Sequence, residues 1–118
     1  MDLYRQNILD HYKHPRNFGY VPGVKHKETN SSCGDEVELG LTVRDGKIVA
    51  VGFKGQGCAI AMAGASLLTE AIKGKKLSVV KKMTDGQAQK LFGIKVNPAR
   101  KKCATLAWVA LQHVVKNH

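Results

Sequence analysis

The chain has 118 residues, which is the size of one domain and excludes a multidomain enzyme or a long repeat array. Its 19 Lys and Arg against 9 Asp and Glu give a formal net charge of +10, which favours acidic partners over basic ones. The excess lies in the second half, since residues 1–59 carry eight basic and seven acidic side chains and residues 60–118 carry eleven basic and two acidic.

A helix is expected first, over residues 2–14, with Asp2 as its N-cap and Pro15 ending it. Its side facing the core is expected to be an apolar stripe made of Leu3, Ile8, Leu9 and Tyr12. Residues 16–32 contain several turn-forming residues and little periodicity, so a loop is expected there, with one edge strand over residues 24–29.

Two strands joined by a tight turn are expected next. Apolar residues alternate with other residues over 37–43, which is the period of a half-buried strand. Asp45-Gly46 predicts a hairpin turn, and residues 48–54 predict the returning strand. The sheet is therefore expected to be small and antiparallel.

Helices are expected in the rest of the chain. Residues 58–73 predict a helix that ends at Gly74, and Thr84 with Gln87 makes a capping-box pattern for a short helix. Asn97 and Pro98 are expected to start one continuous helix that runs to about residue 116. The apolar residues expected to pack these helices into the core are Met62, Leu67, Leu68, Ile72, Trp108, Leu111, Val114 and Val115. This order of elements predicts an α+β domain spanning residues 1–118.

Three cysteines, Cys33, Cys58 and Cys103, are expected at the ends of elements or in loops. An odd number of cysteines does not fit a paired disulfide framework and instead indicates thiols or metal ligands in a reducing cytosol. The N-terminus lacks the layout of a signal peptide, and no apolar stretch reaches the roughly 18–20 residues of a membrane span. A cytoplasmic protein that is not bound to a membrane is therefore expected.

The cysteines have neighbours that suit a metal or a reactive thiol. Cys58 is expected at the N-terminus of a helix, and Arg100 and Lys102 place positive charge beside Cys103. Asp35 can add an oxygen to the three sulfurs, which makes the four ligands that a tetrahedral Zn²⁺ or an iron–sulfur cluster takes. The alternative is that these are ordinary buried cysteines.

With these residues in view, the chain resembles the scaffold family of iron–sulfur cluster assembly, which includes IscU, SufU and the N-terminal domain of NifU. The resemblance covers essentially the whole chain. It is carried by residues 4–17, by Cys33-Gly34-Asp35, and by residues 45–48, 53–60, 63–70 and 98–108.

The resemblance implies a small antiparallel sheet with helices packed on one face. It also implies that Cys33, Cys58 and Cys103 are sulfur ligands and persulfide acceptors, with Cys103 the main acceptor, and that Asp35 is a metal ligand or tunes cluster release. The implied protein is a scaffold or sulfur acceptor rather than a turnover enzyme. It would take sulfur from a cysteine desulfurase, hold a transient [2Fe-2S] cluster or Zn²⁺, and pass the cluster to apo-proteins as a monomer or transient homo-oligomer.

Features of two branches of this family meet in the chain. Lys102 stands where the IscU branch has a histidine, and Arg100 resembles the SufU branch. The short interval from Cys58 to Cys103 resembles IscU, because SufU proteins usually carry an insertion there. A cluster scaffold and a zinc-dependent sulfurtransferase without a stable cluster are therefore both open.

The other polar residues are expected to have no role in this chemistry. All five histidines are expected at the surface, with His26 in a loop; they are His11, His14, His26, His113 and His118. A basic segment is expected to be a solvated face and not a nucleic-acid surface, because no aromatic residue is interleaved with its lysines. It consists of Lys73, Lys75, Lys76, Lys81 and Lys82.

Overall fold

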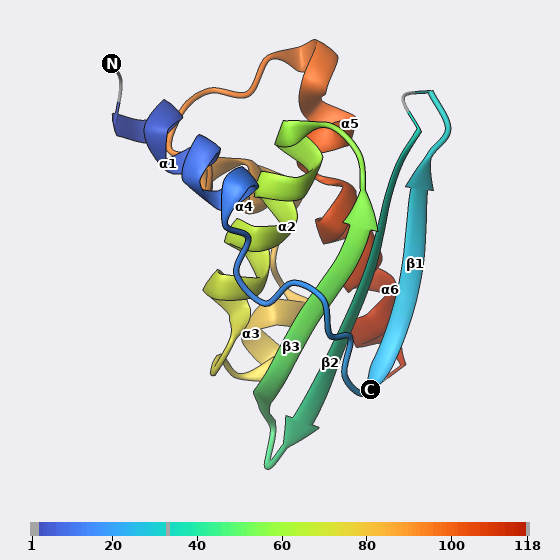
Figure 1. Ribbon diagram of the computed structural model, residues 1–118. Helices are drawn as coiled ribbons and strands as arrows, with labels where there is room; N and C mark the ends of the chain where they lie inside the picture. The colour runs from blue at the N-terminus through green and yellow to red at the C-terminus, as the bar shows by residue number, and fades with distance from the viewer. Residues whose placement is uncertain (1–2, 33, 118) are drawn as a thin grey trace.

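A three-stranded antiparallel sheet in the order β1-β2-β3 forms one layer of the fold, and the helices gather on one of its faces (Figure 1). The computed structural model describes residues 3–32 and 34–117. The elements are α1 (Leu3–Lys13), β1 (Val24–Asn30), β2 (Asp35–Arg44), β3 (Lys47–Gln56), α2 (Ala59–Ile72), α3 (Leu77–Lys81), α4 (Asp85–Lys90), the 3₁₀ turn η1 (Pro98–Arg100), α5 (Lys101–Ala104) and α6 (Leu106–Lys116). The predicted α+β class is confirmed.

The alternating sequence of β2 decides which face of the sheet is buried. Val37, Leu39 and Leu41 are fully buried and point toward the helices, whereas the alternating residues Glu36 and Glu38 are only partly buried. The predicted hairpin forms between β2 and β3, with positive φ angles of 53° at Asp45 and 77° at Gly46. This is the backbone of the two-residue turn that matches the twist of the flanking strands.

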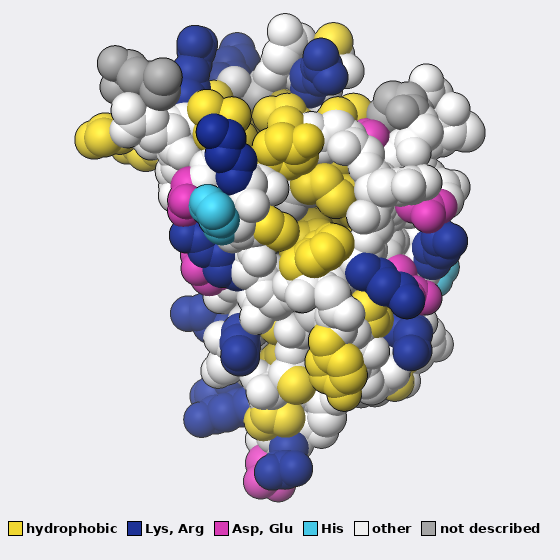
Figure 2. All heavy atoms as spheres, viewed as in Figure 1, with side chains coloured by type: hydrophobic (Ala, Val, Ile, Leu, Met, Phe, Trp, Pro, Cys, Tyr) yellow, Lys and Arg dark blue, Asp and Glu magenta, His cyan; other side chains and the backbone are white. Residues whose placement is uncertain are grey.

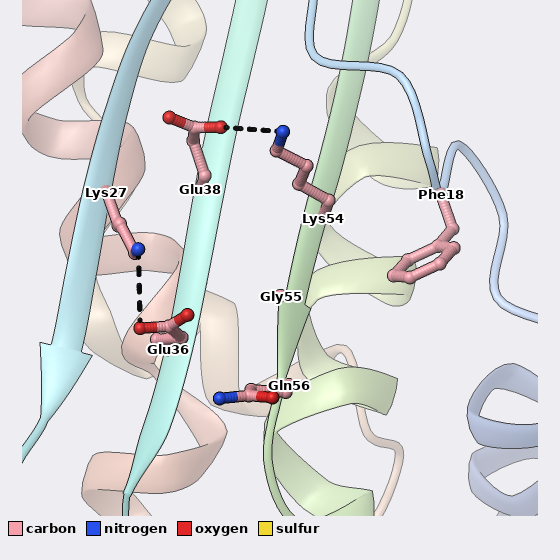
Figure 3. Close-up of a pocket in the computed structure, with 7 residues that line it drawn as sticks. All are labelled: Phe18, Lys27, Glu36, Glu38, Lys54, Gly55 and Gln56. Carbon is pink, nitrogen blue, oxygen red and sulfur yellow. Dashed lines mark ion pairs between the residues drawn. The ribbon is translucent and has the colours of Figure 1, made fainter.

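The face of the sheet away from the helices carries ion pairs between neighbouring strands (Figure 3). Lys27 lies 3.4 Å from Glu36, and Lys54 lies 3.7 Å from Glu38. These residues line an open hollow of about 300 Å³ together with Phe18. Exposed pairs of this kind contribute little to stability, roughly 0–1 kcal/mol each, so the burial of the opposite face holds the sheet in place.

The helices α2 and α6 pack on the buried face of the sheet, and α5 lies against α2. Predicted core residues Leu67, Leu68 and Ile72 of α2 are buried there. At Gly64 a Cβ atom would meet the carbonyl oxygen of Ala104 at 2.8 Å, so glycine lets α5 approach α2 closely. Because Cys103 directly precedes Ala104, this close contact also holds Cys103 in its buried position.

The expectation of one continuous final helix is wrong. Asn97 caps the segment as predicted, accepting a hydrogen bond from the Ala99 N–H, but a 3₁₀ turn, α5 and α6 follow in place of a single helix. The break falls at Thr105, whose hydroxyl donates to the Lys101 carbonyl at 2.9 Å. A hydroxyl that bonds the preceding turn competes with the helical pattern and bends it. Sequence periodicity does not register this bend, because apolar spacing continues through it.

The predicted apolar stripe of α1 is also wrong in three of its four members. Only Ile8 is buried, while Leu3, Leu9 and Tyr12 are exposed, Leu3 by 78%. Hydrophobic side chains gather along the middle of one face of the molecule, with Lys and Arg mostly at its margins (Figure 2). The helix packs on α2 and its buried residues are Ile8 and His11, so the periodic pattern does not describe its buried side.

His11 occupies the buried side of α1, which contradicts its expected place at the surface. It is 3% exposed, and its Nδ1 lies 2.7 Å from the Ser66 hydroxyl. That hydroxyl accepts a bond from the Arg16 N–H, and His11 Nε2 faces Glu70 at 3.8 Å. This network assigns the proton of a neutral imidazole to Nε2, with Ser66 donating to Nδ1. His14, in contrast, is exposed as predicted.

Burial lowers the pKa of His11 in the folded protein, assisted by the charge of Arg16 and opposed by Glu70 and Asp10. The unfolded chain therefore takes up a proton at His11 before the folded protein does, and stability is lost as the pH falls below about 6.5. We expect the free energy of unfolding in urea to fall by up to about 1.4 kcal/mol per pH unit from this group, measured between roughly pH 7.5 and 5. His11→Gln should flatten this slope, and His14→Gln should leave it unchanged. Equal slopes in His11→Gln and the wild type would contradict the assignment.

Two further expectations concern the surface. All five lysines of the predicted basic segment are exposed. No helix among residues 3–32 and 34–117 is long and apolar enough to cross a membrane.

Candidate functional site

Asp35 begins β2 at the end of the sheet where β3 leads into α2. It is 1% exposed even though it is a carboxylate. The strand register explains its position, because Asn30 of β1 lies opposite Asp35 while Glu36 pairs with Gln56 at the end of β3. A buried carboxylate needs hydrogen-bond donors, and the start of α2 supplies them.

Cys58 is the N-cap residue of α2, as the sequence predicts. Its own side chain makes no capping bond. Asp35 reaches this helix end instead, because its Oδ1 accepts a hydrogen bond from the Cys58 N–H at 2.8 Å and its Oδ2 lies 3.5 Å from the Cys58 thiol, which donates to it. The carboxylate also lies at the positive end of the helix dipole. Asp35 and Cys58 are therefore held together by the backbone as well as by their side chains.

Gly57 makes this contact possible. Its φ is 155°, and a Cβ at this position would overlap the Asp35 carboxylate, with the carboxyl carbon only 2.8 Å away. Glycine alone combines that backbone angle with the missing side chain. The sequence indicates a tight turn at Gly57 but not that the turn leaves room for Asp35.

Cys103 approaches the same place from α5 and is buried, at 5% exposure. The Asn30 side-chain amide lies 4.0 Å from its sulfur as a donor. A hollow of about 340 Å³ leads from the surface to Cys103, and Arg100 and Lys102 are exposed on its wall. The two cations thus lie beside the approach to the thiol, as their neighbouring positions in the sequence suggest.

The fold brings Asp35, Cys58 and Cys103 together from three different elements. One carboxylate oxygen and the two sulfurs all lie within 4.8 Å of one another. Around a tetrahedral Zn²⁺ with Zn–S bonds of about 2.3 Å, two sulfurs are about 3.8 Å apart, so small side-chain rotations would bring these atoms to a common ion. Sulfur and carboxylate donors are also the types that zinc accepts. The residues present therefore fit such an ion. Cys33, the remaining predicted ligand, lies outside the described residues.

Asn30 is the site residue that the sequence does not reveal. In the sequence it is one of several turn-forming residues before Cys33. Its side-chain amide lies near the Cys103 sulfur only because the fold brings together residues that are 73 positions apart. Asn30 and Asp35 are paired with each other at the ends of β1 and β2. This pairing of strand ends does not by itself indicate that Cys103 of α5 lies beside Asn30.

The chain matches a family model and characterised relatives over almost its full length. The model described as the NifU-like N terminal domain matches residues 3–118. The chain is 43% identical to the zinc-dependent sulfurtransferase SufU of Bacillus subtilis, over 93% of this chain and 87% of the relative. It is 33% identical to the iron–sulfur cluster assembly scaffold protein IscU of Streptococcus pyogenes, over 97% of this chain and 83% of the relative.

Solved structures agree with this assignment. A crystal structure of a SufU from Fervidobacterium islandicum, described as an iron–sulfur cluster assembly scaffold for the SUF system, aligns with a TM-score of 0.74 and 27% identity, covering 93% of this chain and 94% of the other. The N-terminal NifU-like protein of Brucella abortus shares the fold, with a TM-score of 0.76 at 17% identity. The chain belongs to the NifU-like N-terminal domain family.

Proposed function

We propose that the chain is an iron–sulfur cluster assembly scaffold that receives sulfur from a cysteine desulfurase and passes the assembled cluster to apo-proteins in the cytoplasm. The observation that carries this proposal is the convergence of Asp35, Cys58 and Cys103, with their ligand atoms within 4.8 Å of one another. Membership of a family that includes scaffold proteins supports it. Cys33 completes the proposed ligand set.

Cys103 is the proposed sulfur acceptor, because the hollow beside Arg100 and Lys102 gives a partner a route to its sulfur. The Cys103 thiolate would attack the terminal sulfur of a persulfide on the desulfurase. A new S–S bond forms on Cys103, the S–S bond of the donor breaks, and the donor cysteine leaves as a thiolate. The exchange needs no external oxidant or reductant. Arg100 and Lys102 stabilise the negative charge of the attacking sulfur.

The metal ligands proposed are Cys33, Asp35, Cys58 and Cys103. They would hold either a transient [2Fe-2S] cluster, which is the cargo of a scaffold, or Zn²⁺. Asp35 accepts a hydrogen bond from the backbone N–H of Cys58. Of the four ligands, its carboxylate is therefore the one that can most readily leave a bound metal and keep a hydrogen-bond partner in the protein. A site with one such ligand suits loading and release of the cargo.

A second candidate is a zinc-dependent sulfurtransferase that accepts sulfur but keeps no cluster. The observation in its favour is the 43% identity to the Bacillus subtilis SufU, together with Lys102 at the position before Cys103. In this alternative Zn²⁺ would hold the thiols until the desulfurase docks. Both candidates use the same residues and the same sulfur donor.

Anaerobic reconstitution tests the proposal. We expect the full chain, incubated with a cysteine desulfurase, cysteine, ferrous iron and a thiol, to develop the visible absorption of a [2Fe-2S] cluster and then to activate an apo-ferredoxin. Near-stoichiometric zinc in the purified protein, sulfur uptake that chelation abolishes, and no chromophore would reject the scaffold in favour of the zinc-dependent alternative. Cluster formation that Cys58→Ala leaves unchanged would place the cluster elsewhere and contradict the proposed site.

A further inference from the structure

The face of β1 that is turned toward the helices carries polar residues where a buried strand would carry apolar ones. The register places His26 opposite Leu39 and Glu28 opposite Val37, and residues directly opposite each other project from the same face of a sheet. Leu39 and Val37 are fully buried core residues. His26 and Glu28 therefore point into the layer between the sheet and α6, and His26 lies in β1, the edge strand expected over residues 24–29.

His113 of α6 completes a cluster with these two side chains. Its ring stacks on that of His26, with centroids 4.2 Å apart and planes 20° from parallel. One oxygen, Glu28 Oε1, lies 3.0 Å from His26 Nε2 and 3.6 Å from His113 Nε2. The two imidazoles thus direct the same nitrogen at the same carboxylate, and their ligand atoms all lie within 4.8 Å of one another.

This arrangement has the chemistry of a metal site rather than that of a single ion pair. One carboxylate oxygen can satisfy one imidazole, but the second imidazole gains a partner only by sharing that oxygen. Two imidazole nitrogens and one carboxylate oxygen are a donor set for divalent first-row transition metals such as Zn²⁺, with one or more positions left for water. The side chains of His26, Glu28 and His113 are 34%, 28% and 48% exposed, so an ion has access and the rings have room to turn.

We propose that His26, Glu28 and His113 form a second binding site for a divalent transition-metal ion, separate from the site of Asp35, Cys58 and Cys103. His113 is the eighth residue of α6, which puts it about 10 Å along the helix from its first residue. A bound ion would link the edge strand β1 to α6. A groove of about 340 Å³ runs from Glu28 past Asn30 to Lys102, the residue before Cys103.

A zinc titration of the full chain, followed through the imidazole nitrogen resonances, tests this site. After the thiolate site is filled, the next equivalent of Zn²⁺ should shift the resonances of His26 and His113 together and raise the melting temperature by several degrees. His113→Ala should weaken this second binding event at least about 100-fold, since losing a direct ligand costs more than losing one of its supporting partners. Glu28→Gln keeps the size and hydrogen-bonding capacity of the side chain and should give a similar loss.

His14→Ala is the matched control, since His14 is exposed and lies outside the cluster. It should bind the second equivalent as the wild type does. The proposal is overturned if zinc moves neither His26 nor His113, or if Glu28→Gln and His113→Ala retain wild-type affinity while circular dichroism shows that they are folded. Titration with Co²⁺ separates the two sites, because only thiolate ligands give intense charge-transfer absorption in the near ultraviolet. A negative result for the site of His26, Glu28 and His113 would therefore not count against the site of Asp35, Cys58 and Cys103.

Discussion

Replacing Cys103 with serine should abolish sulfur acceptance from a cysteine desulfurase and weaken zinc binding at the thiolate site by at least about 100-fold. Serine keeps the size of the side chain at a position that is only 5% exposed, so the fold should persist. The hydroxyl is neither a sulfur nucleophile of comparable reactivity nor a good zinc ligand. Labelled cysteine measures sulfur uptake, and competition with a chelating dye measures zinc affinity.

Cys58→Ser separates the two properties. This variant should bind zinc as weakly as Cys103→Ser does, but a peptide containing Cys103 should still gain the mass of one sulfur atom after incubation with the desulfurase. Desulfurase turnover in the presence of a small thiol serves as the internal control, because it does not depend on the chain. Wild-type sulfur uptake by Cys103→Ser would show that another cysteine is the acceptor.

Gly57→Ala should have the next largest effect, although position 57 supplies no ligand. The new methyl group would occupy the space of the Asp35 carboxylate, whose Cγ lies 2.8 Å from the Cβ position. Asp35 would have to move and give up its 2.8 Å bond from the Cys58 N–H. We expect zinc affinity to fall by about 10- to 100-fold, the range for losing a group that orients a ligand. A backbone held in a region that alanine disfavours costs roughly 1–3 kcal/mol in addition, which urea unfolding would measure.

Gly74→Ala is the matched control for that substitution. Gly74 has a positive φ of 83°, but among residues 3–32 and 34–117 no heavy atom beyond its chain neighbours lies within 4 Å of its Cβ position. It should therefore lose stability from backbone strain alone and keep wild-type zinc affinity. If the two variants bind zinc equally well, the contact between Gly57 and Asp35 does not support the metal site.

Much of the local structure is predictable because its causes are close in the sequence. Alternation over 37–43 predicts β2, and the Asp45-Gly46 pair predicts the hairpin that the positive φ angles confirm. Thr84 and Gln87 form the complete capping box that their spacing predicts. Each of these features depends on residues a few positions apart, where backbone geometry and hydrogen bonding leave few alternatives.

Features that depend on packing between distant segments are less predictable. The buried side of α1 is formed by Ile8 and His11 without Leu3, Leu9 and Tyr12, and His11 has its hydroxyl partner in Ser66, 55 positions away. The break of the final helix at Thr105 has a local cause, the hydroxyl bond to the Lys101 carbonyl, but the apolar spacing continues through it and so does not predict it. Periodicity reports which residues are apolar but not which neighbours will be available.

For the candidate site, the sequence by itself determines the chemistry. Cysteine and aspartate positions, the helix start at Cys58 and the cations beside Cys103 are all present in the order of residues. Only the tertiary structure decides the geometry, because the thiols lie 45 positions apart and meet through the strand register and the close approach of α5 to α2 at Gly64. The same holds for His26 and His113, which are unremarkable as separate histidines and become neighbours when α6 packs on β1. The types of ligand can be predicted from the residues present, whereas their meeting at one point depends on how distant segments of the chain pack together.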